Sequence, residues 1–415
     1  MKAPGPAELM KILVADLFEA SGLEALRTAG CEALYEPELA GERLVRSIES
    51  SGADVLVVRS TKVTEGMLDA GRLSLIVRAG AGVNTVDVLA ASRRGIYVSN
   101  CPGKNAMAVA ELTFGLMLAL DRRIPDNVAD LRAGRWNKQE YSRASGLYGR
   151  TLGLLGFGSI GQEVARRARG FGMHTIVWSP RFLRDGAAAM AALPHDVEIT
   201  VLNAPEEVAE QSDVLSLHLA LTDDTRNVVG AAILSRLRPG TLFVNTARAE
   251  LVDHAALADA QTRGVRVAVD VFPGEPTEAG ASFSSPLVDF ANVYGTHHIG
   301  ASTDQAQEAI AAEVVRVIRV YKETGKDPNV VNLSMRTPVT HRLVVRHRDR
   351  PGVLASVFDH LRRWGLNVQE TENVIFEGAE AAVARINLNG EPPANLMRAI
   401  EGGSQDILSL QDVKI

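Results

Sequence analysis

The stretch TLGLLGFGSIG, residues 151–161, decides the fold expected for this chain. It places the pattern G-x-G-x-x-G directly after a short apolar strand and before a helical segment, residues 162–170. Gly156 permits a tight turn, Gly158 lets the backbone approach a pyrophosphate, and Gly161 allows close packing of helix against strand. A tight turn without a ligand is the alternative, but the strand and helix favour dinucleotide binding. The cofactor contacts expected in this loop are Gly156, Gly158, Ser159, Ile160 and Gly161.

The segments on both sides of this loop alternate short apolar strands with helices. Before the loop, strands are expected at residues 11–18, 54–59, 75–79 and 96–99. From the loop onward, they are expected at residues 152–156, 174–178, 214–219, 241–245 and 265–270. Such alternation is typical of parallel sheets with helices on both faces. The expected fold class is therefore α/β, with two doubly wound, Rossmann-like domains, and SGADVLVVRS (51–60) loosely echoes EQSDVLSLHL (210–219).

Two long helical patterns, residues 105–123 and 303–324, follow the two sets of strands, and such helices can cross between domains. The stretch MRTPVTH, residues 335–341, has the composition of a linker. The order strand, helix, strand, strand, helix, strand after it indicates a small α+β domain. We expect a discontinuous substrate-binding domain (1–106 and 300–334), a dinucleotide-binding domain (107–299) and a small C-terminal domain (338–415).

Composition and charge argue against several other classes of protein. With 46% hydrophobic and 23% charged residues, the chain is expected to fold into compact domains. The net charge of −6 leaves no basic surface for nucleic acid or an anionic membrane. The longest apolar stretch, residues 106–120, falls short of the ~20 residues of a membrane span, and no secretion signal is evident, so a cytoplasmic location is expected. Cys31 and Cys101 lie in no metal-binding pattern, so no metal is expected.

The end of the second strand of the dinucleotide domain bears on the choice of cofactor. About 20 residues after the glycine loop, an acidic residue usually accepts hydrogen bonds from the adenosine ribose. This chain has Ser179-Pro180-Arg181 there instead. Without a carboxylate, discrimination against a 2′-phosphate is lost, and Arg181 can pair with one. NAD is the expected cofactor and NADP stays open, while the plainer interpretation makes Arg181 a solvated cation.

Three segments carry residues suited to the oxidation of a hydroxy acid. Such chemistry needs a cation for the substrate carboxylate, an acid/base at the hydroxyl, and a group that tunes this acid/base. In NTARAELVD, Arg248 follows a strand, and its guanidinium suits bidentate recognition of a carboxylate. DVFPGEP offers Glu275, and GTHHIG offers His297 and His298. A glutamate beside a histidine would fix its tautomer and favour its protonated form, whereas alone these residues would be read as structural.

With the glycine loop, these motifs resemble the D-isomer-specific 2-hydroxyacid dehydrogenase family over about residues 11 to 333. The resemblance implies His298 as the acid/base, Glu275 as its partner and Arg248 as the carboxylate clamp. The further cofactor contacts it implies are Asp270, at the nicotinamide carboxamide, and Ser179, Arg181, His218, Thr246 and Ala247. Ala249 replaces a usual glycine and His297 a common proline. Both departures change backbone freedom, and neither removes a catalytic group.

Three segments of the N-terminal domain point to the substrate. VRSTKV, RAGAGVN and NCPGKN each follow an expected strand. Gly80 and Gly82 would let backbone amides approach a carboxylate, and Arg59 and Arg78 offer positive charge beyond it. A phosphate-bearing acid fits these residues better than lactate or glyoxylate, and they resemble the branch of the family that oxidises 3-phosphoglycerate. The substrate contacts expected on this basis are Arg59, Ser60, Arg78, Gly80, Ala81 and Gly82.

Resemblance extends to subunit contacts and regulation. In that branch a basic stretch reaches a neighbouring subunit's active site, and Arg135-Trp136-Asn137-Lys138 matches it, which implies Lys138 as a substrate contact within a homodimer or homotetramer. The C-terminal residues resemble the ACT domain, a ligand-sensing module, and the effector contacts implied are His347, Asp349 and Asn367. L-serine is one candidate effector, and Asp349 replaces an asparagine of the serine-binding relatives. The alternative is a domain that serves only assembly.

Two alternatives to phosphoglycerate oxidation stay open. The same scaffold can act on glyoxylate, hydroxypyruvate or another 2-keto acid, and the substrate-side arginines discriminate between these. In a different class, some proteins of this fold sense a dinucleotide as binding modules without turnover. The ACT-like tail and the lack of long disordered segments argue against that class.

Overall fold

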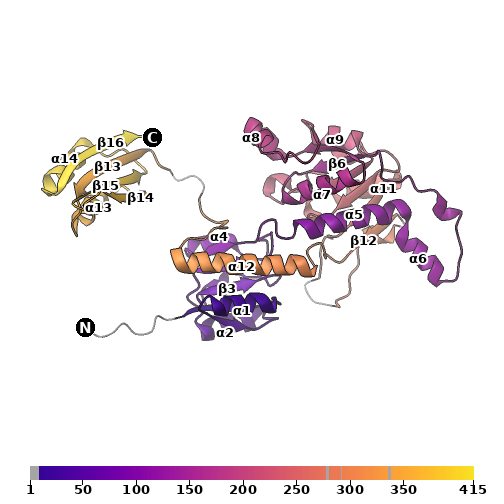
Figure 1. Ribbon diagram of the computed structural model, residues 1–415, viewed down its shortest axis with the longest axis horizontal. Coiled ribbons are helices and arrows are strands. Elements are labelled where there is room, and N and C mark those ends of the chain that lie inside the picture. Colours follow the sequence, from indigo (N-terminus) through magenta and orange to yellow (C-terminus); the bar gives the residue numbers. More distant parts are fainter. Residues whose placement is uncertain (1–8, 277–279, 291, 335–337) are drawn as a thin grey trace. The chain divides into compact units, whose positions relative to one another are not determined.

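The computed structural model describes residues 9–276, 280–290, 292–334 and 338–415. It divides into two compact units, Met1–Asn332 and Leu333–Ile415 (Figure 1). The first unit contains two parallel sheets with helices and the second an antiparallel sheet, so the expected fold class is confirmed. The linker expected at residues 335–341 lies partly outside the described residues. Among the helices of these ranges, none is long and apolar enough to span a membrane.

The first sheet has five parallel strands in the order β2-β1-β3-β4-β5. The strands are β1 (Met10–Val14), β2 (Cys31–Tyr35), β3 (Val55–Val58), β4 (Leu75–Arg78) and β5 (Tyr97–Ser99). The helices between them are α1 (Ala20–Thr28), α2 (Gly41–Ser51), α3 (Glu65–Leu68) and α4 (Val88–Arg93). Strand β3, VLVV, is buried throughout because helices cover both faces. One face packs on α2, α3 and α4, and the other on α1 and the returning helix α12 (Asp304–Thr324).

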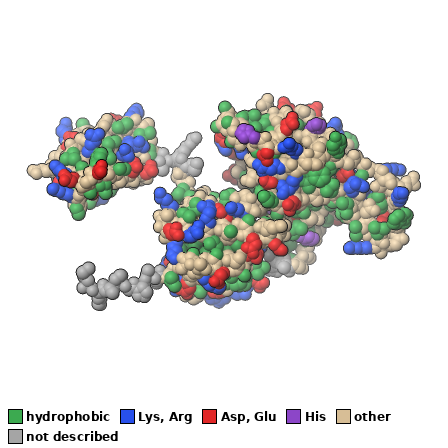
Figure 2. Space-filling model, viewed as in Figure 1, with side chains coloured by type: hydrophobic (Ala, Val, Ile, Leu, Met, Phe, Trp, Pro, Cys, Tyr) green, Lys and Arg blue, Asp and Glu red, His purple; other side chains and the backbone are tan. Residues whose placement is uncertain are grey.

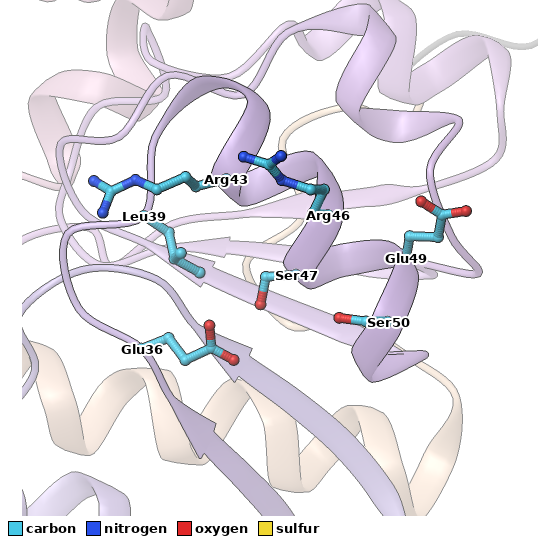
Figure 3. A pocket seen from close by; sticks show the side chains of 7 residues that line it. All are labelled: Glu36, Leu39, Arg43, Arg46, Ser47, Glu49 and Ser50. Carbon is cyan, nitrogen blue, oxygen red and sulfur yellow. The ribbon is translucent and has the colours of Figure 1, made fainter.

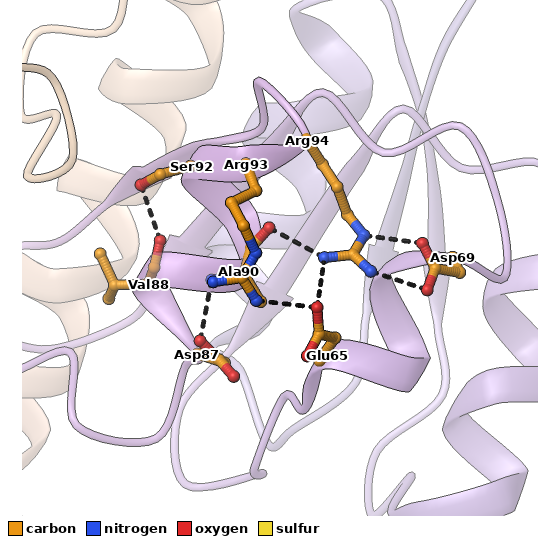
Figure 4. Close-up of polar contacts among 8 residues, drawn as sticks. All are labelled: Glu65, Asp69, Asp87, Val88, Ala90, Ser92, Arg93 and Arg94. Atoms are coloured by element: carbon orange, nitrogen blue, oxygen red, sulfur yellow. Dashed lines mark hydrogen bonds and ion pairs between the residues drawn. The ribbon is translucent and has the colours of Figure 1, made fainter.

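Surface ion pairs join α3 to the end of α4, as Figure 4 shows. Arg94 forms a bidentate pair with Asp69 at 2.6 and 2.8 Å, and Glu65 accepts from Arg93 and Arg94. The hydrogen bonds from these arginines lower the pKa of both carboxyl groups. Since the pairs are exposed, water and salt screen them, and their contribution to stability is small.

The second sheet has seven parallel strands in the order β12-β11-β10-β9-β6-β7-β8. The strands are β6 (Thr151–Leu155), β7 (His174–Trp178), β8 (Thr200–Val201), β9 (Val214–Leu217), β10 (Leu242–Asn245), β11 (Arg266–Val269) and β12 (Val293–Gly295). Helices α5 (Ala106–Arg122) and α7 (Ser159–Gly170) pack on one face. Helices α9 (Pro205–Gln211), α10 (Ala231–Leu234) and α11 (His254–Thr262) pack on the other. Two further helices, α6 (Ile124–Arg132) and α8 (Pro180–Ala191), follow α5 and β7.

The strand order reverses between β1 and β3 in the first sheet and between β6 and β9 in the second. In open α/β sheets, ligands bind at the carboxyl ends of the strands beside such a reversal. The two stretches that echo each other in sequence contain β3 and β9, which therefore occupy equivalent places in their sheets. The order of the strands places the glycine loop, after β6, at one of these two binding positions.

The C-terminal unit has the predicted order of strands and helices. Its elements are β13 (His341–Arg348), α13 (Val353–Arg363), β14 (Val368–Ile375), β15 (Ala381–Leu388), α14 (Ala394–Gly403) and β16 (Ile407–Lys414). The strands form an antiparallel sheet in the order β14-β15-β13-β16. Apolar residues of both helices and all four strands make its core, in which Leu343, Val357 and Leu396 are buried. The unit thus buries an apolar core of its own.

Candidate active site

The predicted catalytic residues follow neighbouring strands of the second sheet, at its carboxyl edge. Glu275 lies in the loop after β11, and His298 in the loop after β12. Nδ1 of His298 lies 2.7 Å from Oε2 of Glu275, and the Phe272 amide donates to Oε1 at 2.8 Å. With Nδ1 donating to the carboxylate, Nε2 of the imidazole is left for a substrate hydroxyl. The side chain of His298 is 47% exposed, so a substrate can reach it.

Opposing effects act on the carboxyl group of Glu275. Burial raises its pKa, but the hydrogen bonds from His298 and the Phe272 amide, with the charge of Arg248, outweigh burial. The net result is a pKa below the ordinary value, so Glu275 is ionised at neutral pH. An ionised carboxylate at Nδ1 fixes the tautomer of His298 and stabilises the imidazolium that forms when Nε2 takes a proton.

Asp270 braces the loop that carries His298. Its buried carboxylate accepts hydrogen bonds from the Thr296 hydroxyl and from the amides of Ile299 and Gly300, at 2.6 to 2.9 Å. This bracing holds His298 at φ 52°, a backbone conformation uncommon for residues other than glycine. The sequence predicts that Asp270 contacts the nicotinamide. Among the described residues, its Oδ2 accepts only the Gly300 amide, so a lone pair is left for one further donor.

Arg248 follows β10 and faces the loop of the first sheet that contains Gly82. A Cβ on Gly82 would lie 2.7 Å from Nη2 of Arg248. The buried Asn245 holds this segment, because its side chain accepts from the Ala247 amide and donates to the Arg248 carbonyl, both at 2.9 Å. Ala249 adopts no positive φ, so it replaces a glycine without backbone strain. Sequence reasoning missed Asn245, although a buried amide at the end of a strand is a signal for such bracing.

The glycines of the cofactor loop have the environments that their predicted tasks require. Gly156 has φ +100°, and a Cβ there would meet the His218 carbonyl at 2.4 Å. A Cβ on Gly161 would lie 2.5 Å from the Gly156 carbonyl oxygen, so the start of α7 packs closely on the loop. Among the described residues, none approaches within 4 Å of a Cβ built on Gly158. The residues present therefore fit a pyrophosphate placed against Gly158 at the N-terminus of α7.

Two side chains near this loop bear on the dinucleotide. Arg181 lies in the N-terminal turn of α8, which Ser179 precedes. Its Nη1 donates to the carbonyl of Phe157 in the glycine loop at 3.4 Å. Nε2 of His218 pairs with Ser216 at 2.9 Å, and burial lowers the pKa of His218 to about 3. Among the described residues, the buried Nδ1 of His218 has no hydrogen-bond partner. A buried nitrogen without a partner suits a ligand contact.

Arg59, Arg78 and Arg248 form a cluster of three cations. Burial, followed by the charges of Arg248 and Arg59, lowers the pKa of Arg78 to about 10, so its guanidinium is still charged at neutral pH. Nε of Arg78 donates to the Arg59 carbonyl at 2.9 Å. In the described part of the chain, the guanidinium of Arg59 makes no hydrogen bond or ion pair. A cluster of three cations suits an anion with more than one charge.

The substrate-side glycines lie against arginine side chains. The Gly80 amide donates to the Arg78 carbonyl at 2.8 Å, and is therefore not free to bind a carboxylate. A Cβ on Gly80 would lie 1.8 Å from Nη1 of Arg78, so this glycine makes room for the guanidinium instead. Gly82 makes room for Arg248 in the same way. Ser60 is also engaged, because its amide and hydroxyl donate to Asp16 at 3.1 and 3.3 Å. The carbonyl of Ala81 accepts a hydrogen bond from the side-chain amide of Asn100 at 2.6 Å.

The segment after α6 folds back on Asp130. The carboxylate of Asp130 accepts from the side chains of Arg135, Asn137 and Tyr141. These hydrogen bonds lower the pKa of Asp130 to about 2. Together these residues line a hollow of about 270 Å³ that also includes Trp136 and Lys138. Among the described residues, the Lys138 ammonium makes no hydrogen bond or ion pair, and the chain does not bring it to the catalytic pair by any contact.

The three predicted effector residues are not joined by hydrogen bonds within one chain. His347 is buried, and its ring nitrogens lie 2.7 Å from the Arg348 carbonyl and 3.2 Å from Oδ1 of Asn373. The amide of Asp349 donates to the Glu380 carbonyl, and the exposed Asn367 pairs through its backbone with Asn389. Asn373 is a neighbour of His347 that sequence reasoning missed, because β14 lies two strands away from β13.

A larger hollow lies away from all of these residues. Its volume is about 690 Å³, and it is lined by one face of α2 and the segment after β2 (Figure 3). The side chains at its rim are Glu36, Leu39, Arg43, Arg46, Ser47, Glu49 and Ser50. None of the predicted site residues lines it. Size alone therefore does not identify the active site of this chain.

Comparisons with known proteins show which proteins this chain resembles. Residues 114–300 match the model of the D-isomer specific 2-hydroxyacid dehydrogenase, NAD binding domain. A D-3-phosphoglycerate dehydrogenase of Methanocaldococcus jannaschii is 34% identical over 384 residues, which cover 92% of this chain and 67% of that protein. A hydroxypyruvate reductase of Thermotoga maritima is 41% identical over 276 residues, 66% of this chain and 85% of that protein. The NAD⁺-bound 3-phosphoglycerate dehydrogenase of Entamoeba histolytica superposes with a TM-score of 0.64 and 27% identity, over 79% of this chain and all of that one.

Proposed function

Because this chain belongs to the D-isomer specific 2-hydroxyacid dehydrogenase family, we propose that it oxidises D-3-phosphoglycerate to 3-phosphohydroxypyruvate with NAD, the step that begins L-serine synthesis. The cluster of Arg59, Arg78 and Arg248 carries the proposal. One guanidinium is needed for the substrate carboxylate, and the other two supply positive charge for a phosphate. An acid without a phosphate would bring a single negative charge to this cluster of three cations.

The catalytic roles follow from the contacts of each group. Arg248 binds the substrate carboxylate and so orients C2. When bound, NAD supplies the nicotinamide C4 that accepts a hydride from C2. Nε2 of His298 takes the hydroxyl proton as the C2–O bond becomes a carbonyl, and Glu275 stabilises the resulting imidazolium through Nδ1. In the reverse direction His298 returns the proton to the carbonyl oxygen.

The test is the initial rate of NADH formation with 3-phosphoglycerate, with NADP in parallel and a coupled step that removes the product. We expect turnover that His298→Ala abolishes.

A second candidate function is the reduction of hydroxypyruvate. It is favoured by the hydroxypyruvate reductase of Thermotoga maritima, which is 41% identical to this chain, against 34% for the phosphoglycerate dehydrogenase of Methanocaldococcus jannaschii. Reduction of hydroxypyruvate or glyoxylate without any turnover of 3-phosphoglycerate would select this second candidate.

The choice between cofactors depends on Arg181. The family model names NAD, and the Ser179-Arg181 turn lacks the carboxylate that excludes NADP. Arg181 lies in the first turn of α8, directly after the strand end where the adenosine ribose is expected, so its guanidinium can pair with a 2′-phosphate. We therefore propose that NADP is accepted as a second cofactor.

We also infer a homodimer or homotetramer in which the segment after α6 reaches the neighbouring active site. Helix α6 has no buried residue, and Ile124, Val128, Leu131 and Trp136 expose apolar surface there (Figure 2). Such a surface is expected to be covered by a second copy, and Lys138 would then add a cation to that copy's substrate site.

The cytoplasm remains the proposed location. The domain boundaries proposed are those expected from the sequence: 1–106 with 300–334, then 107–299, then 338–415.

The C-terminal unit is proposed to bind L-serine as a feedback inhibitor. Its contacts would come from His347, Asp349 and Asn367, with Asn373 beside His347. Asp349 would pair with the ammonium of the amino acid. Inhibition of the initial rate by L-serine that His347→Ala removes would support this role, and insensitivity of the native enzyme to L-serine would contradict it.

A further inference from the structure

Asp16 occupies an anion-binding site that the protein fills with its own carboxylate. It follows β1, at the carboxyl edge of the first sheet, beside the point where the strand order reverses. Oδ2 of Asp16 accepts from three consecutive amides, those of Arg59, Ser60 and Thr61, at 2.6, 3.1 and 3.0 Å. Oδ1 accepts from the hydroxyls of Ser60 and Thr61 at 3.3 and 3.0 Å. Three amides and the Ser60 hydroxyl of one short loop therefore donate to one side chain, and the Thr61 hydroxyl shares its one proton between Asp16 and the Leu39 carbonyl, 3.1 Å away.

These bonds determine the position of the substrate-side arginines. The loop fixed by Asp16 starts with Arg59, whose guanidinium has no partner among the described residues. The carbonyl of Arg59 in turn accepts Nε of Arg78 at 2.9 Å. Gly80 leaves the space that the end of the Arg78 guanidinium fills. Asp16 thus fixes the backbone from which the Arg59 side chain extends and, through the Arg59 carbonyl, the position of the Arg78 guanidinium.

The loop of Arg59, Ser60 and Thr61 therefore has a different role from direct binding of the substrate. Because its amides and hydroxyls are turned to Asp16, they are not available for the substrate, and the guanidinia are left to meet its anion. The negative charge of Asp16 also acts on Arg78, whose charged form it favours. Loss of Asp16 would release the loop and leave three amides to compete for the same anion.

Resting on the proposed function, we propose that Asp16 is a positioning residue that sets the preference of this enzyme for a phosphorylated acid. It acts through the orientation of Arg59 and Arg78, and it touches neither the cofactor nor the reacting atoms. Asp16→Ala is expected to raise KM for 3-phosphoglycerate about tenfold, with kcat within twofold of the native value. KM for hydroxypyruvate, which lacks the phosphate, should stay within twofold.

The conservative variant separates geometry from charge. The oxygen of an asparagine can accept from the three amides, and its NH₂ can donate to the two hydroxyls. Asp16→Asn should therefore restore KM for 3-phosphoglycerate to within threefold of the native value. Equal losses in both variants would overturn the proposal, because the effect would then come from the charge alone.

The matched control lies at the other end of the same strands. Asp54 accepts the Lys11 amide at 2.8 Å and so ties the start of β3 to β1, as Asp16 ties their ends. Asp54→Ala should cost comparable thermal stability and leave KM for both substrates unchanged. If Asp16→Ala lowers kcat/KM for both substrates equally, or Asp54→Ala imitates it, Asp16 is merely structural and the proposal fails.

A binding measurement distinguishes failure of this proposal from failure of the proposed function. The affinity of 3-phosphoglycerate for the enzyme with NADH is read from the dependence of Tm on ligand concentration, which needs no turnover. A tenfold weaker affinity in Asp16→Ala supports the positioning role even if the native enzyme does not oxidise this acid. If Asp16→Ala does not fold, Thr61→Val, which removes one donor to Asp16, should raise KM two- to threefold, and an unchanged KM would overturn the proposal.

Discussion

The carboxylate of Glu275 contacts His298 through a single hydrogen bond of 2.7 Å, and this bond is open to a direct test. In Glu275→Gln the amide can still accept from Nδ1, but it cannot stabilise an imidazolium. We expect kcat to fall about 100-fold, within the range for loss of acid/base catalysis, while KM for NAD changes less than twofold. Steady-state kinetics at saturating NAD measure both values. A fall in kcat of less than threefold would exclude a catalytic role for this pair.

Arg181 is the residue whose replacement should change cofactor choice. Its guanidinium lies in the first turn of α8, directly after the strand end where the 2′-phosphate of the adenosine ribose is expected. In Arg181→Ala, kcat/KM for NADP should fall at least tenfold and kcat/KM for NAD less than threefold. Arg184, an exposed arginine on the same helix paired with Asp185, supplies the control variant Arg184→Ala. Equal effects on both cofactors would show that Arg181 does not discriminate between them.

At the scale of single residues, the sequence identified functional residues that stand in recognisable motifs. It did not identify residues whose importance comes from contacts with distant parts of the chain. Arg248, Glu275 and His298 stand in motifs, and the structure places Glu275 against His298. Asp16 was not predictable, because its partners lie more than 40 residues away and depend on β3 lying beside β1. The space that Gly80 leaves for Arg78 was not predictable for the same reason, since the side chain that needs this space is identified only in three dimensions.

Helix α12 carries a buried charge network that predicts a pH dependence of stability. Glu313, 6% exposed, accepts hydrogen bonds from Arg316 and Asn329 and pairs with Lys104. The bonds from Arg316, Asn329 and Lys104 outweigh burial and lower the pKa of Glu313 to about 2. A lowered pKa in the folded state stabilises the fold above the unfolded value of about 4.5, and the stabilisation is lost as pH falls toward 2.

Glu313→Gln should therefore lower the free energy of unfolding by about 2 kcal/mol at pH 7. The difference in Tm from the native protein should shrink steadily between pH 5 and pH 3. Thermal unfolding followed by circular dichroism at several pH values measures it. Glu323→Gln, at an exposed position of the same helix, is the control. A Tm difference that is independent of pH would mean that packing, not charge, is lost in Glu313→Gln.

Element by element, periodic segments were predicted well and short or half-exposed ones were not. The helix expected at residues 303–324 is α12, which begins after its Thr303 cap. Strand β2, CEALY, escaped prediction because it lies at the edge of its sheet and only Cys31 is fully buried. Strand β8 has only two residues, too few for a pattern. Tertiary pairing, which no local pattern reports, creates both strands.

For the whole molecule, the exposed apolar side of α6 predicts self-association. Leu131, 55% exposed, lies on this helix beside the segment that carries Lys138. Leu131→Glu should convert an assembly to monomers at micromolar concentration and raise KM for the substrate, since Lys138 would no longer reach a neighbour. Leu183→Glu, at a leucine on α8 that is 65% exposed, is the control. Mass from analytical ultracentrifugation decides, and a monomeric native protein would contradict the prediction.

The place of α12 in the chain also governs how a nascent chain folds. Its Ile310, Val314 and Val317 pack on β1, β3 and β4, yet the whole dinucleotide-binding segment is synthesised in between. At typical rates of translation, tens of seconds separate the emergence of β5 from that of α12. During this interval the later segment can complete its core while the earlier sheet keeps one apolar face partly bare. The N-terminal strands, although made first, therefore complete their packing only after the dinucleotide-binding segment has emerged, and are the segment that a ribosome-bound chaperone would shield.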